Sequence, residues 1–127
     1  VLLVDDDEMN RFFGKKLLAH LGVEAMVVES GHEAIELLQT QYFDVVFMDV
    51  SMPDMDGYET TRKIREDSRF SDLLIVALTA HVIAGERERC LAAGMNGYLS
   101  KPFEMEDMKR TLHEQYAKNI SAQKCIE

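Results

Sequence analysis

Side chains that could take part in chemistry stand at or just beyond the ends of apolar runs at four places in the chain. They are Asp5 and Asp6 after residues 1–4, Asp49 after 45–48, Thr79 after 73–78, and Lys101 after 98–99. Carboxylates can hold a divalent cation, a hydroxyl can hydrogen-bond a phosphoryl oxygen, and an ammonium group can bind one as a point charge. These residue types together indicate phosphoryl chemistry beside a metal ion.

That chemistry requires the residues to meet in space, and the apolar runs indicate how they meet. Runs that are apolar throughout are typical of strands covered on both faces of a parallel sheet. The carboxyl ends of parallel strands share one edge, and ligands bind there where the strand order reverses. We therefore predict an α/β fold, a flavodoxin-like (βα)5 doubly wound, five-stranded parallel sheet of order 2-1-3-4-5 with helices on both faces. The reversal then lies between the first and third strands, beside Asp5, Asp6 and Asp49.

Helix-period stretches alternate with these runs, as the predicted fold requires. We expect strands at 1–4, 24–28, 45–48, 73–78 and 98–99, and helices at 9–21, from Ser30 onward, at 58–65, about 82–93 and about 105–116. Asp7 is the expected cap of the first helix, and Ser30 with Glu33 forms a capping box for the second. In the first helix, an apolar stripe comprises Met9, Phe12, Phe13, Leu17, Leu18 and Leu21.

Three carboxylates at one sheet edge repel each other. At ~4 Å and an effective dielectric constant near 20, each pair costs about 4 kcal/mol. A divalent cation relieves that repulsion, and Mg²⁺ typically takes one or two carboxylates together with waters and phosphate oxygens. Aspartate is also a nucleophile for phosphoryl transfer. The acids therefore predict a Mg²⁺ site open to a phosphoryl group.

Each of these residues has a structural explanation when it is taken alone. The acidic run from Asp5 could favour a helix N-terminus, Asp49 could begin a turn, Lys101 could be a solvated surface side chain, and Thr79 could cap a helix. Their joint occurrence at four strand ends favours a functional site. We interpret the remaining acids of the loop 52–57 as turn residues.

The composition limits the classes of function. The chain has 127 residues, which suits one domain, and its net charge of 14 − 23 = −9 is unfavourable for binding nucleic acid. Cys90 and Cys125 are far apart in sequence and are expected to be free thiols. No apolar run approaches the ~18 residues of a membrane span, so we expect no membrane contact by this chain. Because Val1 already lies in an apolar run, we expect the chain to be part of a longer protein.

Four stretches of the sequence match a known pattern. They are Val1 to Asp6, Phe47 to Gly57, Ala77 to Ala80, and Gly97 to Phe103. With them, the chain closely resembles the receiver (response regulator) domain of two-component signalling over residues 1–117, leaving 118–127 as a tail or linker. The loop 52–58 and the run 78–81 look most like receivers of hybrid sensor histidine kinases.

This resemblance implies roles for particular residues. Asp49 would be the phosphoacceptor and Lys101 would contact the phosphoryl group. Mg²⁺ would be held by Asp5, Asp6, Asp49 and the backbone carbonyl of Ser51. Thr79 and Tyr98 would form a switch pair, and the bond from Lys101 to Pro102 would be cis.

The resemblance also implies partners and a cellular place. The phosphodonor would be a histidine kinase or a histidine phosphotransfer domain, and the domain would dephosphorylate itself slowly. If the whole protein is a hybrid kinase, we expect a histidine phosphotransfer domain to dock on the helix expected at 9–21, with Met9 and Phe12 exposed. We expect the isolated domain to be a monomer. It would be cytoplasmic, as a free protein or as the cytoplasmic part of a membrane-bound sensor kinase.

Two other functions also suit the strand-end acids. An aspartate-nucleophile phosphatase would use an Asp-x-Asp motif at Asp5 and Asp7, but Met9 stands where its motif expects Thr or Val, and there is no cap domain. A binding module that never turns over phosphate is the other, and the intact set of Asp, Thr and Lys argues against it.

Overall fold

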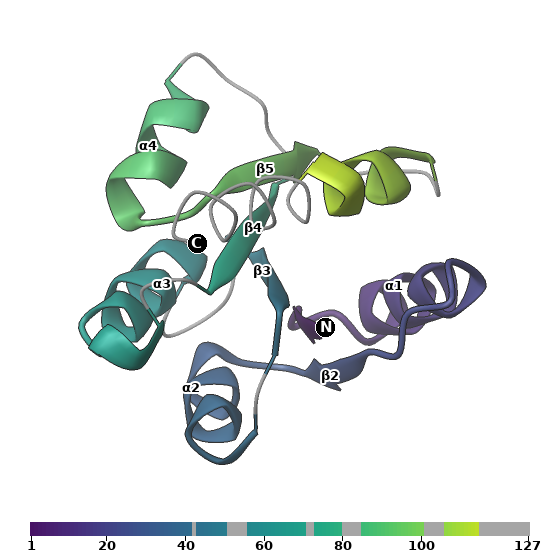
Figure 1. Cartoon of the computed structure of the whole chain (residues 1–127), viewed down its shortest axis with the longest axis horizontal. Helices are drawn as coiled ribbons and strands as arrows, with labels where there is room; N and C mark the ends of the chain where they lie inside the picture. Colours follow the sequence, from purple (N-terminus) through teal and green to yellow (C-terminus); the bar gives the residue numbers. More distant parts are fainter. Residues whose placement is uncertain (42, 51–55, 71–72, 80–84, 101–105, 115–127) are drawn as a thin grey trace, which may run out of the picture.

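The computed structural model describes residues 1–41, 43–50, 56–70, 73–79, 85–100 and 106–114. Strands alternate with helices along the chain (Figure 1). In order, they are β1 (Leu2–Val4), α1 (Glu8–His20), β2 (Met26–Val28), α2 (Gly31–Thr40), β3 (Val45–Asp49), α3 (Gly57–Arg65), the 3₁₀ turn η1 (Ser68–Phe70), β4 (Leu74–Thr79), α4 (Glu86–Ala93) and β5 (Gly97–Ser100). Residues 106–114 are helical. None of the described helices is long and apolar enough to span a bilayer.

The five strands form one parallel sheet in the order β2-β1-β3-β4-β5. This confirms the predicted order, including its reversal between β1 and β3. Helices α2, α3 and α4 cover one face of the sheet, and α1 covers the other together with the helical residues 106–114 (Figure 1).

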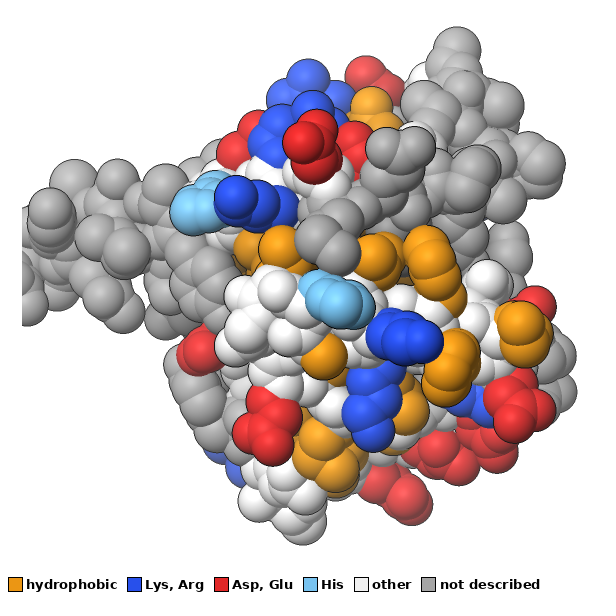
Figure 2. All heavy atoms as spheres, turned by 90° about the vertical axis from the view of Figure 1, so that its right-hand side faces the viewer, with side chains coloured by type: hydrophobic (Ala, Val, Ile, Leu, Met, Phe, Trp, Pro, Cys, Tyr) orange, Lys and Arg blue, Asp and Glu red, His pale blue; other side chains and the backbone are white. Residues whose placement is uncertain are grey.

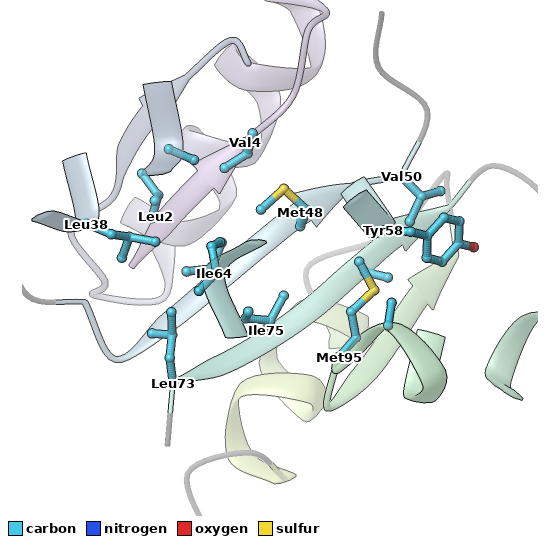
Figure 3. Packing of buried hydrophobic residues seen from close by; sticks show 14 of the residues in the cluster. Leu2, Val4, Leu38, Met48, Val50, Tyr58, Ile64, Leu73, Ile75 and Met95 are labelled. Carbon is cyan, nitrogen blue, oxygen red and sulfur yellow. The ribbon is translucent and has the colours of Figure 1, made fainter. Parts of the chain in front are cut away.

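The sheet separates two hydrophobic cores. Along β3, Val46 and Met48 point into the core under α2, α3 and α4, whereas Val45 and Phe47 point into the core under α1 and residues 106–114. All four side chains are fully buried. Figure 3 shows the first of these cores, with Met48 near its centre. Burial on both faces explains why residues 2–4, 45–48 and 74–78 are apolar throughout.

Polar side chains begin the first three helices, where backbone N–H groups lack helical partners. The Asp7 carboxylate accepts a hydrogen bond from the N–H of Met9 at 2.9 Å, and the Ser30 hydroxyl accepts one from the N–H of Glu33 at 3.2 Å. Both caps were expected. The predicted capping box differs in one bond: the Glu33 carboxylate accepts from the N–H of Glu29, whereas in a capping box it would accept from the N–H of Ser30, the cap residue itself.

The apolar stripe on α1 is buried only in its second half, and the exposure expected of Met9 and Phe12 is confirmed. Leu17 and Leu18 are buried, but Met9, Phe12 and Phe13 are 73%, 63% and 52% exposed. A spacing of four residues advances about 400° around a helix with 3.6 residues per turn, so the stripe drifts by about 40° at each step. Met9 therefore lies about 80° away from Leu17 and leaves the face that meets the sheet.

Helix α4 begins later than the pattern predicts. Its first residue is Glu86, preceded by Gly85 with a left-handed φ of 88°. This conformation suits glycine, which has no Cβ to clash, and it excludes Gly85 from the helix. The expected residues 82–84 lie outside the described part of the chain.

Candidate functional site

Three carboxylates meet where β1 and β3 end. Val4 pairs with Met48 in the sheet, so the next residues, Asp5 and Asp49, stand side by side at its carboxyl edge. One carboxylate oxygen from each of Asp5, Asp6 and Asp49 lies within 4.8 Å of the other two. Asp5 and Asp49 are 1% and 4% exposed, whereas Asp6 faces solvent. The structure thus brings together the three acids that the sequence pattern predicted.

The backbone around Asp5 is held on several sides. Its N–H donates to the carbonyl of Val28 at 3.2 Å, and its carbonyl accepts from the Arg11 guanidinium at 2.8 Å. One carboxylate oxygen of Asp5 accepts from the N–H of Asp7 at 2.9 Å. These contacts orient the Asp5 side chain toward the end of β3.

Asp49 ends the central strand and is enclosed by the start of α3. The N–H of Val50 donates to Leu78 of β4, and the N–H of Gly57 donates to Val50 at 3.2 Å. A Cβ at Gly57 would lie 2.3 Å from the Asp49 carbonyl oxygen, which is far too close for any side chain. Only glycine lets α3 approach the strand end in this way. In the sequence, Gly57 was noted only as part of a turn.

The donor set suits a hard divalent cation. Carboxylate oxygens from three residues converge, two of them held in a buried wall and the third on the solvent side. Oxygen ligands of this kind, with one side open to water or to phosphate oxygens, are what Mg²⁺ requires.

The expected switch residues lie on the neighbouring strands. Thr79 is the last residue of β4 and is buried, one position beyond Leu78, which pairs with Asp49. Tyr98 of β5 pairs with Ala77 and is 37% exposed. Ser51, Lys101 and Pro102, to which the resemblance gave roles, lie outside the described residues.

The position of Asp7 argues against the phosphatase alternative. That mechanism needs the second acid of Asp-x-Asp at the reaction centre. Here the Asp7 carboxylate caps α1, accepting from the N–H groups of Met9 and Asn10, and it is not part of the three-acid group.

A buried polar pair between α3 and α4 had no precedent in the sequence pattern. The Tyr58 hydroxyl donates a hydrogen bond to the carboxylate of Glu86, and both side chains are buried. Burial, followed by the hydrogen bond to Glu86, raises the pKa of Tyr58. Its hydroxyl therefore stays protonated and remains a donor. Tyr58 and Glu86 are 28 residues apart, so no local pattern could reveal the pair.

Comparison with known proteins gives a consistent result. The family model described as response regulator receiver domain matches residues 1–113. Among curated relatives, "Sensor protein GacS" of Pseudomonas syringae pv. syringae is 45% identical over 80% of this chain, and "Probable histidine kinase 6" of Oryza sativa subsp. japonica is 41% identical over 85% of it. The matched part is 12% and 13% of these proteins, so the chain corresponds to a small part of their length.

Solved structures with the same fold include receiver domains. One is the receiver domain of a sensor histidine kinase from Pseudomonas aeruginosa PAO1, described with a magnesium ion coordinated in its active site cleft. It is 38% identical, with a TM-score of 0.83 over 90% of this chain and 93% of that one. The chemotaxis protein CheY4 of Vibrio cholerae is 33% identical, with a TM-score of 0.84 over 89% and 94% of the two chains.

Proposed function

From the premise that this chain belongs to the response regulator receiver domain family, we propose that it accepts a phosphoryl group from a partner phosphohistidine onto Asp49. The observation that carries the proposal is the convergence of Asp5, Asp6 and Asp49 at one edge of the sheet. The reaction would depend on Mg²⁺ and would be followed by slow self-dephosphorylation.

Each residue at this edge of the sheet would have a separate role in phosphoryl transfer. A carboxylate oxygen of Asp49 attacks phosphorus, the bond from phosphorus to the histidine nitrogen breaks, and the imidazole leaves with the electron pair of that bond. Asp5, Asp6 and Asp49 would hold Mg²⁺, with the Ser51 carbonyl as a further ligand. Bound there, the ion would neutralise charge on the phosphoryl oxygens. Lys101 would bind a phosphoryl oxygen, and the Thr79 hydroxyl would donate to another.

Phosphorylation would then be converted into a change of surface. Thr79 would move toward the new phosphoryl group, and the half-exposed ring of Tyr98 would turn inward. The altered surface would comprise α4, β5 and the helical residues 106–114. The positions of Thr79 and Tyr98 on adjacent strands support this pairing.

The partner would be a histidine kinase or a histidine phosphotransfer domain, and the whole protein would be a hybrid sensor histidine kinase with this domain in the cytoplasm. Helix α1 offers a suitable docking surface. Met9, Phe12 and Phe13 are exposed on it, and the Lys16 ammonium lies 5.3 Å from the centroid of the Phe12 ring. Figure 2 shows this side of the molecule, where hydrophobic side chains lie exposed among basic ones.

The transfer is tested by incubating the chain with acetyl phosphate and Mg²⁺ and measuring the phosphorylated fraction by intact mass. We expect labelling of the parent, no labelling of Asp49→Asn, and loss of labelling when EDTA removes Mg²⁺. Labelling of Asp49→Asn at the parental level would refute the assignment.

The docking surface is tested separately with Phe12→Asp. We expect slower transfer from a phosphorylated histidine phosphotransfer domain and an unchanged rate with acetyl phosphate, because Phe12 is exposed on α1 and is not one of the three acids that would hold Mg²⁺. An equal loss with both donors would contradict the docking assignment.

A further inference from the structure

The first turn of α4 holds Tyr58 at two points. The hydroxyl donates to Glu86, the first residue of α4, and the guanidinium of Arg89 lies 4.7 Å from the centroid of the ring. Tyr58 and Glu86 are 7% and 4% exposed. The two contacts leave the tyrosine little freedom to move unless the start of α4 moves with it.

A buried glutamate is expensive unless hydrogen bonds replace its lost hydration. Its place in the first turn of α4 is favourable, because the positive end of the helix dipole stabilises a carboxylate there. The hydrogen bond from Tyr58 adds a second stabilising contact. The pair therefore makes the position of α4 depend on a residue of α3.

Tyr58 is also tied to the phosphoacceptor strand. It directly follows Gly57, which packs against the carbonyl of Asp49 and donates to that of Val50. Figure 3 shows Val50 and Tyr58 next to each other at one end of the core that they share. A change in the backbone at Asp49 and Val50 is thus passed to Tyr58 through direct contacts.

We propose that Tyr58 and Glu86 form a latch that holds α4 in its unphosphorylated position and that phosphorylation of Asp49 must release. This inference rests on the proposed function, in which Tyr98 turns inward on phosphorylation. Tyr98 is 37% exposed, as the proposed function expects of the ring before phosphorylation. Tyr58 acts as a positioning residue, since its hydroxyl and ring contact Glu86 and Arg89 of α4 and it is not one of the three acids.

The latch is tested by titrating the full chain with beryllofluoride, a phosphoryl analogue, in Mg²⁺ and following the Gly57 amide by NMR. Tyr58→Phe keeps the ring beside Arg89 and removes only the hydroxyl. We expect it to bind beryllofluoride about fivefold more tightly, the size of effect that loss of one net hydrogen bond produces. In Glu86→Gln the acceptor is neutral and the bond is weaker, so a smaller gain in affinity is expected. The double variant should gain no more than Tyr58→Phe alone, because both changes act on one bond.

A matched control is Thr40→Val, which removes a hydroxyl that bonds to the Leu37 carbonyl at 3.2 Å in α2, a helix outside the surface formed by α4, β5 and residues 106–114. It should leave the affinity unchanged. Urea unfolding establishes that each variant is folded. Unchanged or weaker binding by folded Tyr58→Phe would overturn the latch, because a purely structural bond stabilises both states equally. Failure of the parent to bind, or equal binding by Asp49→Asn, would instead refute the proposed function.

Discussion

Neutralising Asp6 is expected to stabilise the metal-free protein. The carboxylate oxygens of Asp5, Asp6 and Asp49 lie within 4.8 Å of one another, so Asp6 repels two neighbours. At that distance a pair costs about 3.5 kcal/mol at an effective dielectric constant near 20 and about 0.9 kcal/mol in water. Because Asp6 is exposed, the lower figure applies. Asp6→Asn should therefore raise the free energy of unfolding by about 2 kcal/mol in EDTA at low salt, and by less as salt screens the repulsion.

Magnesium should reduce this advantage. At a Mg²⁺ concentration of about 100 times its dissociation constant, the parent gains about 2.7 kcal/mol of stability. If the loss of one charged ligand weakens binding about tenfold, the variant gains only about 1.4 kcal/mol at the same concentration. The difference between the two proteins then falls from about 2 to about 0.7 kcal/mol. Urea unfolding of the parent and of Asp6→Asn, each with and without Mg²⁺, measures the four free energies of unfolding.

Asp7→Asn is the matched control, because it removes the same charge one residue further along. Asn is as good a helix cap as Asp, so the bonds to Met9 and Asn10 can be kept. Its stability should change little, and its response to Mg²⁺ should remain that of the parent. If Asp6→Asn were less stable than the parent in EDTA, or if it gained as much from Mg²⁺, the argument from charge repulsion would be wrong.

Three further outcomes follow from the packing. Gly57→Ala should lower the free energy of unfolding by about 1–3 kcal/mol, because the new Cβ would lie 2.3 Å from the Asp49 carbonyl oxygen and α3 would have to shift. Urea unfolding measures the change, and parental stability would contradict the prediction. Asn96→Ala should lower the free energy of unfolding by about 1–2 kcal/mol in the same assay, because the Asn96 side-chain oxygen accepts a hydrogen bond of 2.8 Å from the N–H of Ile75 in β4. An unchanged free energy of unfolding would show that water replaces the Asn96 side chain as the acceptor. In a Cys125→Ser background, the Cys90 thiol should react with iodoacetamide far more slowly in the native state than in urea, because it is buried. Burial, followed by the charge of Glu86, also raises the pKa of this thiol and so reduces the reactive thiolate. Equal reaction rates in the native and unfolded states would refute the prediction.

The sheet and its acids could be predicted because each depends on a local pattern. Wholly apolar runs predict parallel strands buried on both faces, and an acid directly after such a run lies at the carboxyl edge whatever the details of packing. Asp5, Asp6 and Asp49 therefore meet as expected, and the strand order is confirmed. The caps at Asp7 and Ser30 follow equally local rules.

Features that depend on helix rotation or on distant partners could not be predicted. The apolar residues of α1 form one stripe in the sequence, but how far the stripe is buried depends on packing. Gly14, Leu17 and Leu18 meet the sheet, and this rotation of the helix leaves Phe13 exposed as well. Gly14 lies so close to the sheet that a Cβ there would be 2.7 Å from the side chain of Leu3. The pairing of Tyr58 with Glu86 depends on how α3 and α4 pack, which neither segment encodes alone.

Because the central sheet divides the interior into two separate cores, neighbouring residues of one strand are under different packing constraints. Phe47 must fit the side chains beneath α1 and residues 106–114, whereas Met48 must fit those beneath α2, α3 and α4. A change of side-chain volume in one core therefore meets a different set of neighbours from the same change one residue further along the strand.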